Sequence, residues 1–245
     1  MKILGVIPAR YASTRFPAKA LVDIRGKSMI QRVYEQACKA NSLSSVIVAT
    51  DHAEVYDHVK SFGGKVLMTS SDHKSGTDRC HEALGLVPGD YDFLINIQGD
   101  EPFIAPTQID LLAGSLKSGS EIGTLVREIQ DFSALEDNNN VKVIFDTHLR
   151  AIYFSRQPIP FVRGVVEENW LNHHLYYQHV GIYAFRTDVL GKITALPTSS
   201  LEEAESLEQL RWMENGFYID VAITEMDSYG IDTPKDLERA LNDFK

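Results

Sequence analysis

Short apolar runs of strand length alternate along the first hundred residues with segments whose apolar positions recur at helical spacing. The runs lie at 3–7, 46–50, 65–68 and 93–97. Between them, the spacing predicts helices over 29–40, 55–62 and 77–84. This alternation is typical of parallel βαβ units. Proline cannot donate to an interior ladder, so we expect the first strand to end before Pro8.

The second half of the chain has a more mixed pattern. Candidate strands at 141–145, 151–155 and 180–185 follow one another closely around proline-containing loops, which favours some antiparallel pairing. A helix is predicted over 202–214 and a strand over 218–224. The closing DTPKDLERALNDF predicts a helix capped by Thr233 with Pro234 at its first position. Its inward stripe is Leu237, Ala240 and Leu241. The pattern predicts one α/β domain, 1–245, with a mixed, mostly parallel sheet.

Composition narrows the class of protein. The chain has 245 residues, 44% of them hydrophobic, and a formal net charge of -10. That charge argues against binding nucleic acid or an anionic membrane, because both require a basic face. No apolar run approaches the roughly 18 residues of a membrane span, so we expect a cytoplasmic protein. Cys38 and Cys80 stand without further Cys/His spacing and predict neither a disulfide framework nor a zinc site.

The loop PARYASTRFPAK places three cations just past the first strand. Arg10, Arg15 and Lys19 occur with no carboxylate before Asp23. Because ligands of open α/β sheets bind outside the carboxyl ends of strands, the loop predicts a site for a phosphate, against the alternative of an ordinary solvated loop. The RGKS sequence at 25–28 fails as a P-loop, since Leu21 stands at the required glycine, and no G-x-G-x-x-G follows the strand.

Two further turns carry carboxylates after strands or strand-like runs. Asp100 lies in QGDEP and Asp232 in DTP, and together with the cations they fit a triphosphate bound with Mg²⁺. Both residues also have ordinary interpretations, Asp100 as a turn former and Asp232 as a helix-entry residue. His173, His174 and His179 cluster without an acidic or cysteine partner at ligand spacing, which favours structural or surface roles. The pattern alone predicts a phosphate-binding α/β protein.

Eight strings in the same order resemble one family. PARYASTRFPAK, VATDH, SGTDR, NIQGDEP, AIYFSR, HVGIYAF, LEQLRWMENG and DTPKDLERA are similar to the bacterial 3-deoxy-manno-octulosonate cytidylyltransferases, or CMP-Kdo synthetases. The resemblance implies a Rossmann-like three-layer nucleotidyltransferase with a small antiparallel dimerisation region. It also implies that CTP and the acidic sugar Kdo give CMP-Kdo and pyrophosphate with Mg²⁺, for lipopolysaccharide biosynthesis, in a homodimer.

The resemblance also assigns roles to individual residues. Arg10, Arg15 and Lys19 are expected to hold the triphosphate, with Arg10, Lys19 and Asp100 as the catalytic set. Asp100 and Asp232 match the metal-binding aspartates. The cytidine is expected near Ser75, Gly76 and Arg79, and the sugar at Gln98, Arg156, His179, Tyr183, Glu208 and Gln209.

Some positions depart from the family pattern. Ala18 replaces a glycine of the cationic loop, so we expect a backbone with negative φ there. Ser200 and Ser206 stand on the sugar side where a proline and a bulky apolar residue are usual. The 8-amino analogue of Kdo or another acidic sugar, such as a sialic acid, is therefore an alternative substrate. A non-catalytic nucleotide-binding protein is a further alternative, against which the presence of Lys19, Asp100 and Asp232 together argues.

Overall fold

The computed structural model describes residues 1–11, 16–227 and 229–243. Contacts divide the chain into two compact units. The first comprises Met1–Gly114, Ala184–Thr194 and Ser228–Lys245, and the second Ser115–Tyr183 and Ala195–Asp227. We describe each unit by itself, and the single domain predicted over 1–245 stays a prediction.

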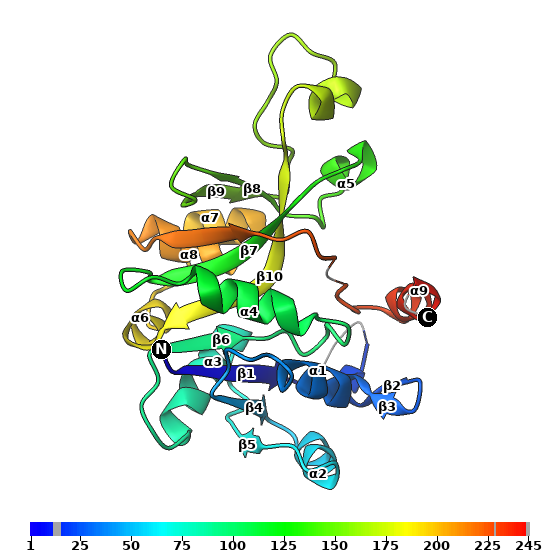
Figure 1. The fold of residues 1–245 in the computed structure, drawn as a ribbon, viewed down its shortest axis with the longest axis vertical. Coiled ribbons are helices and arrows are strands. Elements are labelled where there is room, and N and C mark those ends of the chain that lie inside the picture. The colour runs from blue at the N-terminus through cyan, green and yellow to red at the C-terminus, as the bar shows by residue number, and fades with distance from the viewer. Residues whose placement is uncertain (12–15, 228, 244–245) are drawn as a thin grey trace. The chain divides into compact units, whose positions relative to one another are not determined.

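The first unit contains the parallel sheet that the sequence predicts. β1 pairs in parallel with both β4 and β6, and β4 pairs in parallel with β5 (Figure 1). Six of the seven residues of β1 are buried, which explains why it reads as a continuous apolar run. The strands are β1 (Ile3–Ala9), β4 (Ser45–Thr50), β5 (Val66–Met68) and β6 (Phe93–Asn96).

Pro8 does not end the first strand, contrary to the prediction. β1 continues to Ala9, and Pro8 stands opposite Ala49 of β4. On its other side, the register with β6 runs only from Ile3 to Val6. A proline is tolerated where one neighbouring strand has stopped, because its missing N–H then costs no ladder hydrogen bond.

Two helices of the first unit, α1 and α9, begin where local sequence signals predict. α1 starts after Ser28, whose side chain accepts a hydrogen bond from the N–H of Gln31, and it buries one apolar face. α9 starts at Pro234 and buries Ala240 with Leu237 and Leu241 beside it, as predicted. The helical elements are η1 (Lys19–Leu21), α1 (Met29–Ala37), α2 (Ala53–Ser61), α3 (Gly76–Leu86), α4 (Pro106–Ser115), α6 (Thr187–Thr194) and α9 (Pro234–Asp243), with a short ladder of β2 (Asp23–Ile24) and β3 (Lys27–Ser28).

The second unit combines parallel and antiparallel pairs. β7 and β11 are parallel, while β8 is antiparallel to β9 and to β10, which confirms the antiparallel part of the fold prediction. β7 had no counterpart in the prediction, and neither had the helices α4 and α6 listed above with the first unit. The elements are β7 (Ile122–Glu128), α5 (Phe132–Glu136), β8 (Lys142–Phe145), β9 (Ala151–Ser155), η2 (Glu167–Asn172), β10 (Tyr177–Arg186, continuing into the first unit), α7 (Ser200–Glu205), α8 (Glu208–Glu214) and β11 (Ile219–Ile223).

One predicted helix is two. The segment 202–214 forms α7 and α8, separated at Ser206, which takes the left-handed conformation with φ 53°. A residue at positive φ ends a helix, and the apolar spacing that continues beyond it gave no sign of the break. Within the described ranges, no helix is long and apolar enough to cross a membrane.

Candidate functional site

Lys19, Asp100 and Asp232 meet in the first unit. The Nζ of Lys19 lies 2.7 Å from Oδ2 of Asp100 and 2.8 Å from Oδ1 of Asp232. The Lys19 side chain is 16% exposed, and those of Asp100 and Asp232 are 29% and 47% exposed. Burial by itself lowers the pKa of Lys19, but the two carboxylates outweigh it and raise that pKa above its ordinary value. The ammonium therefore carries its charge at neutral pH.

The cationic loop delivers Lys19 by a turn that the sequence did not predict. Ala18 has φ 54° and ψ 26°, so the expectation of negative φ at this position is wrong. The turn is held by two backbone bonds, because the N–H of Ala18 donates to the carbonyl of Tyr11 and the N–H of Leu21 donates to that of Ala18. Lys19 then opens η1. Arg15 lies outside the described residues.

Asp100 is positioned by the close approach of β1 to the segment that follows β6. The N–H of Ile97 donates to the carbonyl of Val6 at 2.9 Å. A Cβ on Gly99 would lie 2.7 Å from the carbonyl oxygen of Pro8, so only glycine fits there. The carbonyl of Asp100 accepts from the N–H of Ile231 at 2.9 Å, and this bond joins the QGDEP turn to the segment before Asp232.

Asp232 lies between a buried residue and a helix cap. Ile231 belongs to an apolar cluster with Ile24, Met29 and Ala240. The hydroxyl of Thr233 accepts from the N–H of Asp236, whose carboxylate accepts in return from the N–H of Thr233. Thr233 therefore caps the helix, and the Asp232 carboxylate reaches Lys19.

The carboxylate pair fits an oxygen-coordinated divalent cation. In the described part of the chain, no group of three or more His, Cys, Asp or Glu side chains is arranged to hold a metal. Mg²⁺ is usually bound by one or two carboxylates and takes its other ligands from water and substrate phosphates. Asp100 and Asp232 satisfy that requirement, and the ammonium of Lys19 already occupies a cation position between them.

Arg79 is the most enclosed of the predicted site residues. Its side chain is fully buried and donates to Oγ1 of Thr69 at 2.6 Å, to the carbonyl of Ser70 at 3.1 Å and to Oδ2 of Asp51 at 2.7 Å. Asp51 directly follows β4, and Thr69 directly follows β5. Arg79 therefore joins the carboxyl ends of two strands. The role of Asp51 was not predicted, although its place directly after a parallel strand was a usable signal.

The remaining residues predicted for the cytidine gather where α3 begins. Ser75 caps α3 through a capping box with Asp78. Gly76 lies against Pro8, whose Cγ would be 3.3 Å from an added Cβ. Arg10 donates from Nη2 to the carbonyl of Lys74. The structure thus brings Arg10, Ser75 and Gly76 together, and a helix N-terminus beside an arginine suits an anion or a polar base edge.

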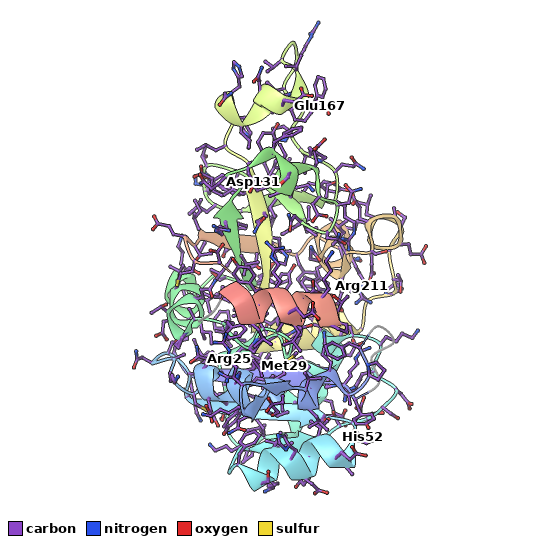
Figure 2. All side chains as sticks on the ribbon, turned by 90° about the vertical axis from the view of Figure 1, so that its right-hand side faces the viewer. Arg25, Met29, His52, Asp131, Glu167 and Arg211 are labelled. Atoms are coloured by element: carbon purple, nitrogen blue, oxygen red, sulfur yellow. The ribbon has the colours of Figure 1, made fainter. Side chains whose placement is uncertain are left out.

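An aromatic pair lies beside this group. The ring of Tyr11 stacks on that of His52 with centroids 3.6 Å apart, and the N–H of Tyr11 donates to Asp51. His52 lies at the start of α2 (Figure 2). Its position is fixed because Nδ1 of its ring accepts a hydrogen bond from the N–H of Glu54. The described start of the cationic loop is therefore anchored to the end of β4.

His179 in the second unit is a neutral imidazole. Its Nε2 lies 2.9 Å from Oγ1 of Thr124, which itself lies 2.7 Å from the carbonyl of Ile182. The hydroxyl has a single proton to donate to that carbonyl, so Nε2–H donates to Thr124 and Nδ1 is left as an acceptor. Burial lowers the pKa of His179 to about 3.

Tyr183 and Glu208 belong to the same surroundings as His179. The ring of Tyr183 lies 5.0 Å from that of His179 and 5.2 Å, edge to face, from that of Trp212. Burial, with a smaller contribution from the nearby Glu208 carboxylate, raises the pKa of Tyr183 well above 10. Glu208 and the buried Gln209 open α8, which also carries Trp212. Four of the predicted sugar residues therefore share two neighbouring elements.

Arg156 serves a different part of the second unit. It donates from Nε to the carbonyl of Glu205 at 2.7 Å and from Nη1 to that of Asn138 at 3.0 Å. The Glu205 carboxylate accepts in turn from the hydroxyl of Ser155 and the N–H of Arg156. Lys142, which is fully buried, donates to the carbonyls of Asp137 and Asn140. Two cations thus hold the loop 137–140, and neither Lys142 nor Glu205 was predicted.

Gln98 belongs to the turn that carries Asp100, whereas His173 and His174 lie apart from the groups described above. Gln98 precedes Gly99 in the first unit and is partly buried. His173 and His174 are exposed at the end of η2, in accord with the surface role predicted for them.

The fold is that of the α/β nucleotidyltransferases. A cytidylyltransferase from Leptospira borgpetersenii superposes with a TM-score of 0.64 over all of this chain and 88% of its own, at 18% identity. At that identity the likeness concerns the fold alone.

Sequence similarity is more specific. A cytidylyltransferase family model matches residues 4–226. A 3-deoxy-manno-octulosonate cytidylyltransferase from Bacteroides thetaiotaomicron is 54% identical over 244 residues, which cover 98% of this chain and 97% of the relative. A CMP:2-keto-3-deoxy-manno-octonic acid synthetase, solved with CTP, superposes with a TM-score of 0.92 at 42% identity, over 99% of this chain and 98% of its own. The chain belongs to the 3-deoxy-manno-octulosonate cytidylyltransferase family.

Proposed function

We propose that this enzyme transfers the cytidylyl group of CTP to Kdo, giving CMP-Kdo and pyrophosphate for lipopolysaccharide biosynthesis. The observation that carries the proposal is the convergence of Lys19, Asp100 and Asp232 beside the carboxyl ends of β1 and β6. The choice of CTP and Kdo as substrates is supported by the relatives named as Kdo cytidylyltransferases or synthetases, which match this chain over nearly its full length.

The reaction requires positioning and charge neutralisation more than proton abstraction. The anomeric hydroxyl of Kdo attacks the α-phosphorus of CTP, and the bond to pyrophosphate breaks. Arg10 and Lys19, with Arg15, are proposed to bind the triphosphate and offset charge on the leaving group. Asp100 and Asp232 are proposed to hold Mg²⁺, which would activate the hydroxyl and neutralise phosphate charge. No strong general base is needed.

We propose two kinds of role around the cytidine. Ser75 and Gly76 lie at the accessible start of α3, beside Arg10, and are assigned to nucleotide binding. Arg79 is assigned to positioning, because its guanidinium is buried and bonded to Asp51, Thr69 and Ser70. It would act on the nucleotide by fixing the ends of β4 and β5.

Sugar-binding roles are proposed for Gln98 in the first unit and, within the second unit, for the residues around His179. Neutral His179 offers Nδ1 as an acceptor for a sugar hydroxyl, and the protonated phenol of Tyr183 offers a donor. Glu208 and Gln209 add further polar groups at the start of α8. Arg156 provides positive charge for an acidic sugar.

We also propose a cytoplasmic homodimer. Phe161, Val166 and Leu175 expose 70%, 63% and 56% of their surface in the segment between β9 and β10. Exposed apolar surface is typical of interaction sites, so we propose this segment as part of the dimer interface. Sedimentation velocity at micromolar concentration is expected to give twice the mass of 27.5 kDa. A species at the monomer mass would contradict the dimer.

Pyrophosphate release tests the function. CTP and Kdo are supplied with Mg²⁺, with EDTA, and with the 8-amino analogue of Kdo in place of Kdo. We expect rapid release with Kdo that EDTA abolishes. Release with the analogue alone would retain the mechanism and change the substrate, and silence with every acidic sugar would support a nucleotide-binding protein without turnover.

A further inference from the structure

Lys19 and the two aspartates satisfy one another in this structure, although the proposed reaction assigns them to different partners. We infer that the Lys19 ammonium is an exchangeable cation, which occupies the carboxylates of Asp100 and Asp232 before the nucleotide arrives and competes there with the divalent cation. This inference rests on the proposed metal site. It makes Lys19 a positioning residue for metal entry as well as a phosphate ligand.

The geometry supports a shared position. A single nitrogen contacts one oxygen of each carboxylate, at 2.7 and 2.8 Å. Two carboxylates with one ammonium leave a net negative charge at this point, so a doubly charged cation is favoured over a singly charged one. The carboxylates are also more exposed than the ammonium, and a hydrated ion can therefore reach them from solvent.

The contact has the properties of a reversible one. Lysine carries a compact charge on a flexible four-carbon stem, so its ammonium can move several ångströms without any change in the backbone. Asp100 and Asp232 are held independently of Lys19, since the carbonyl of Asp100 accepts from Ile231 and the N–H of Asp232 donates to Asp236. The backbone that carries each carboxylate is therefore held by bonds that do not depend on the ammonium.

Competition and a bracing role predict changes of opposite sign in metal affinity when Lys19 is replaced. If the ammonium must leave before the metal binds, only molecules with free carboxylates can bind the ion. The apparent metal affinity of the nucleotide-free protein then equals the intrinsic affinity multiplied by the fraction of such molecules. Removing the ammonium is expected to tighten divalent-cation binding about tenfold. This factor corresponds to the contribution of one hydrogen bond to a charged, partly buried group. A lysine that only braces the two turns predicts weaker binding after its removal.

The test is a titration of nucleotide-free protein with Mn²⁺, followed by the electron paramagnetic resonance signal of the free ion. Lys19→Met is compared with wild type, and Asp100→Asn and Asp232→Asn report whether the ion uses the proposed site. Lys27→Met is the matched control, because Lys27 forms an ion pair with Glu35 elsewhere in the first unit. Lys19→Gln replaces Lys19→Met if the latter fails to fold.

The outcomes separate the inference from the proposed function. We expect about tenfold tighter Mn²⁺ binding in Lys19→Met, no change in Lys27→Met, and loss of binding in both aspartate variants. If the aspartate variants lose binding and Lys19→Met binds no tighter than wild type, the exchange is overturned and the metal site stands. If the aspartate variants bind normally, the metal site fails, and the exchange fails with it.

Discussion

Replacing Arg79 by methionine tests whether the buried ion pair with Asp51 supports the first unit. The guanidinium has no exposed surface, and the Asp51 side chain is 14% exposed. Methionine fills much of the volume but removes all three hydrogen bonds, which leaves a mostly buried carboxylate without its counter-charge. Breaking one partner of such a pair costs about 3–5 kcal/mol.

The expected loss is large against the whole stability of a domain, which is typically about 5–15 kcal/mol. Arg79→Lys is therefore included as a milder variant, because it keeps the charge and loses the forked geometry. Asp51→Asn in the Arg79→Met background is expected to recover about 1–3 kcal/mol, since it neutralises the stranded carboxylate. Lys27→Met, at an exposed ion pair, is expected to cost less than about 1 kcal/mol.

Equilibrium unfolding in urea can assign the loss to the first unit. Both tryptophans, Trp170 and Trp212, lie in the second unit, so their fluorescence reports that unit while far-UV circular dichroism reports both. We expect the dichroism transition of Arg79→Met to shift to lower urea by more than the fluorescence transition. A loss below about 1 kcal/mol, or additive effects of the Arg79 and Asp51 changes, would refute the reasoning.

Three further predictions concern single positions. Asp100→Asn and Asp232→Asn are each expected to lower pyrophosphate release about 100-fold or more with unchanged dichroism; near-normal Mg²⁺-dependent rates would remove that residue from the site. Ala18→Gly is expected to raise the free energy of unfolding by about 1 kcal/mol, because glycine adopts φ 54° without strain, while Ala20→Gly is expected to lower it; equal effects would contradict the left-handed turn. The pKa of His179 is lowered to about 3 in the folded protein, so the unfolded chain binds the proton first as pH falls. The free energy of unfolding is therefore expected to decrease below about pH 6.5, by at most about 1.4 kcal/mol per pH unit. In His179→Gln, the free energy of unfolding is expected to depend less steeply on pH over the same range.

The parallel half of the fold was predictable because its signals are local. Each buried strand reads as an apolar run, and Ser28 and Thr233 mark helix starts within three residues. The errors arose where tertiary context decides. Pro8 remains in β1 because the pairing with β6 ends before it. The break between α7 and α8 depends on the left-handed conformation of Ser206, which a serine in the sequence does not predict.

The candidate site was predictable only in part. Because ligands of open α/β sheets bind beyond the strand ends, the sequence predicted that the loops carrying Lys19, Asp100 and Asp232 could meet. In the structure these three side chains are in contact. It could not reveal that Arg79 is fully buried, because a charged residue in a helix is expected to face solvent. The same expectation hid Lys142, which is fully buried in β8. Burial of a charge depends on partners distant in sequence, here Asp51 for Arg79.

Lys19 and Arg79 differ in burial, and burial separates the structural cation from the one that we propose to be functional. Both pair with carboxylates that follow strands or turns of the first unit. Arg79 is inaccessible and forms three bonds in a fixed fork, so exchanging its partner would expose a buried charge at a cost of several kcal/mol. Lys19 contacts carboxylates that are 29% and 47% exposed, where water can replace the ammonium. A site that binds a metal and a triphosphate, as we propose here, requires an exchangeable cation such as Lys19. The buried ion pair of Arg79 stabilises the strand ends of the same unit.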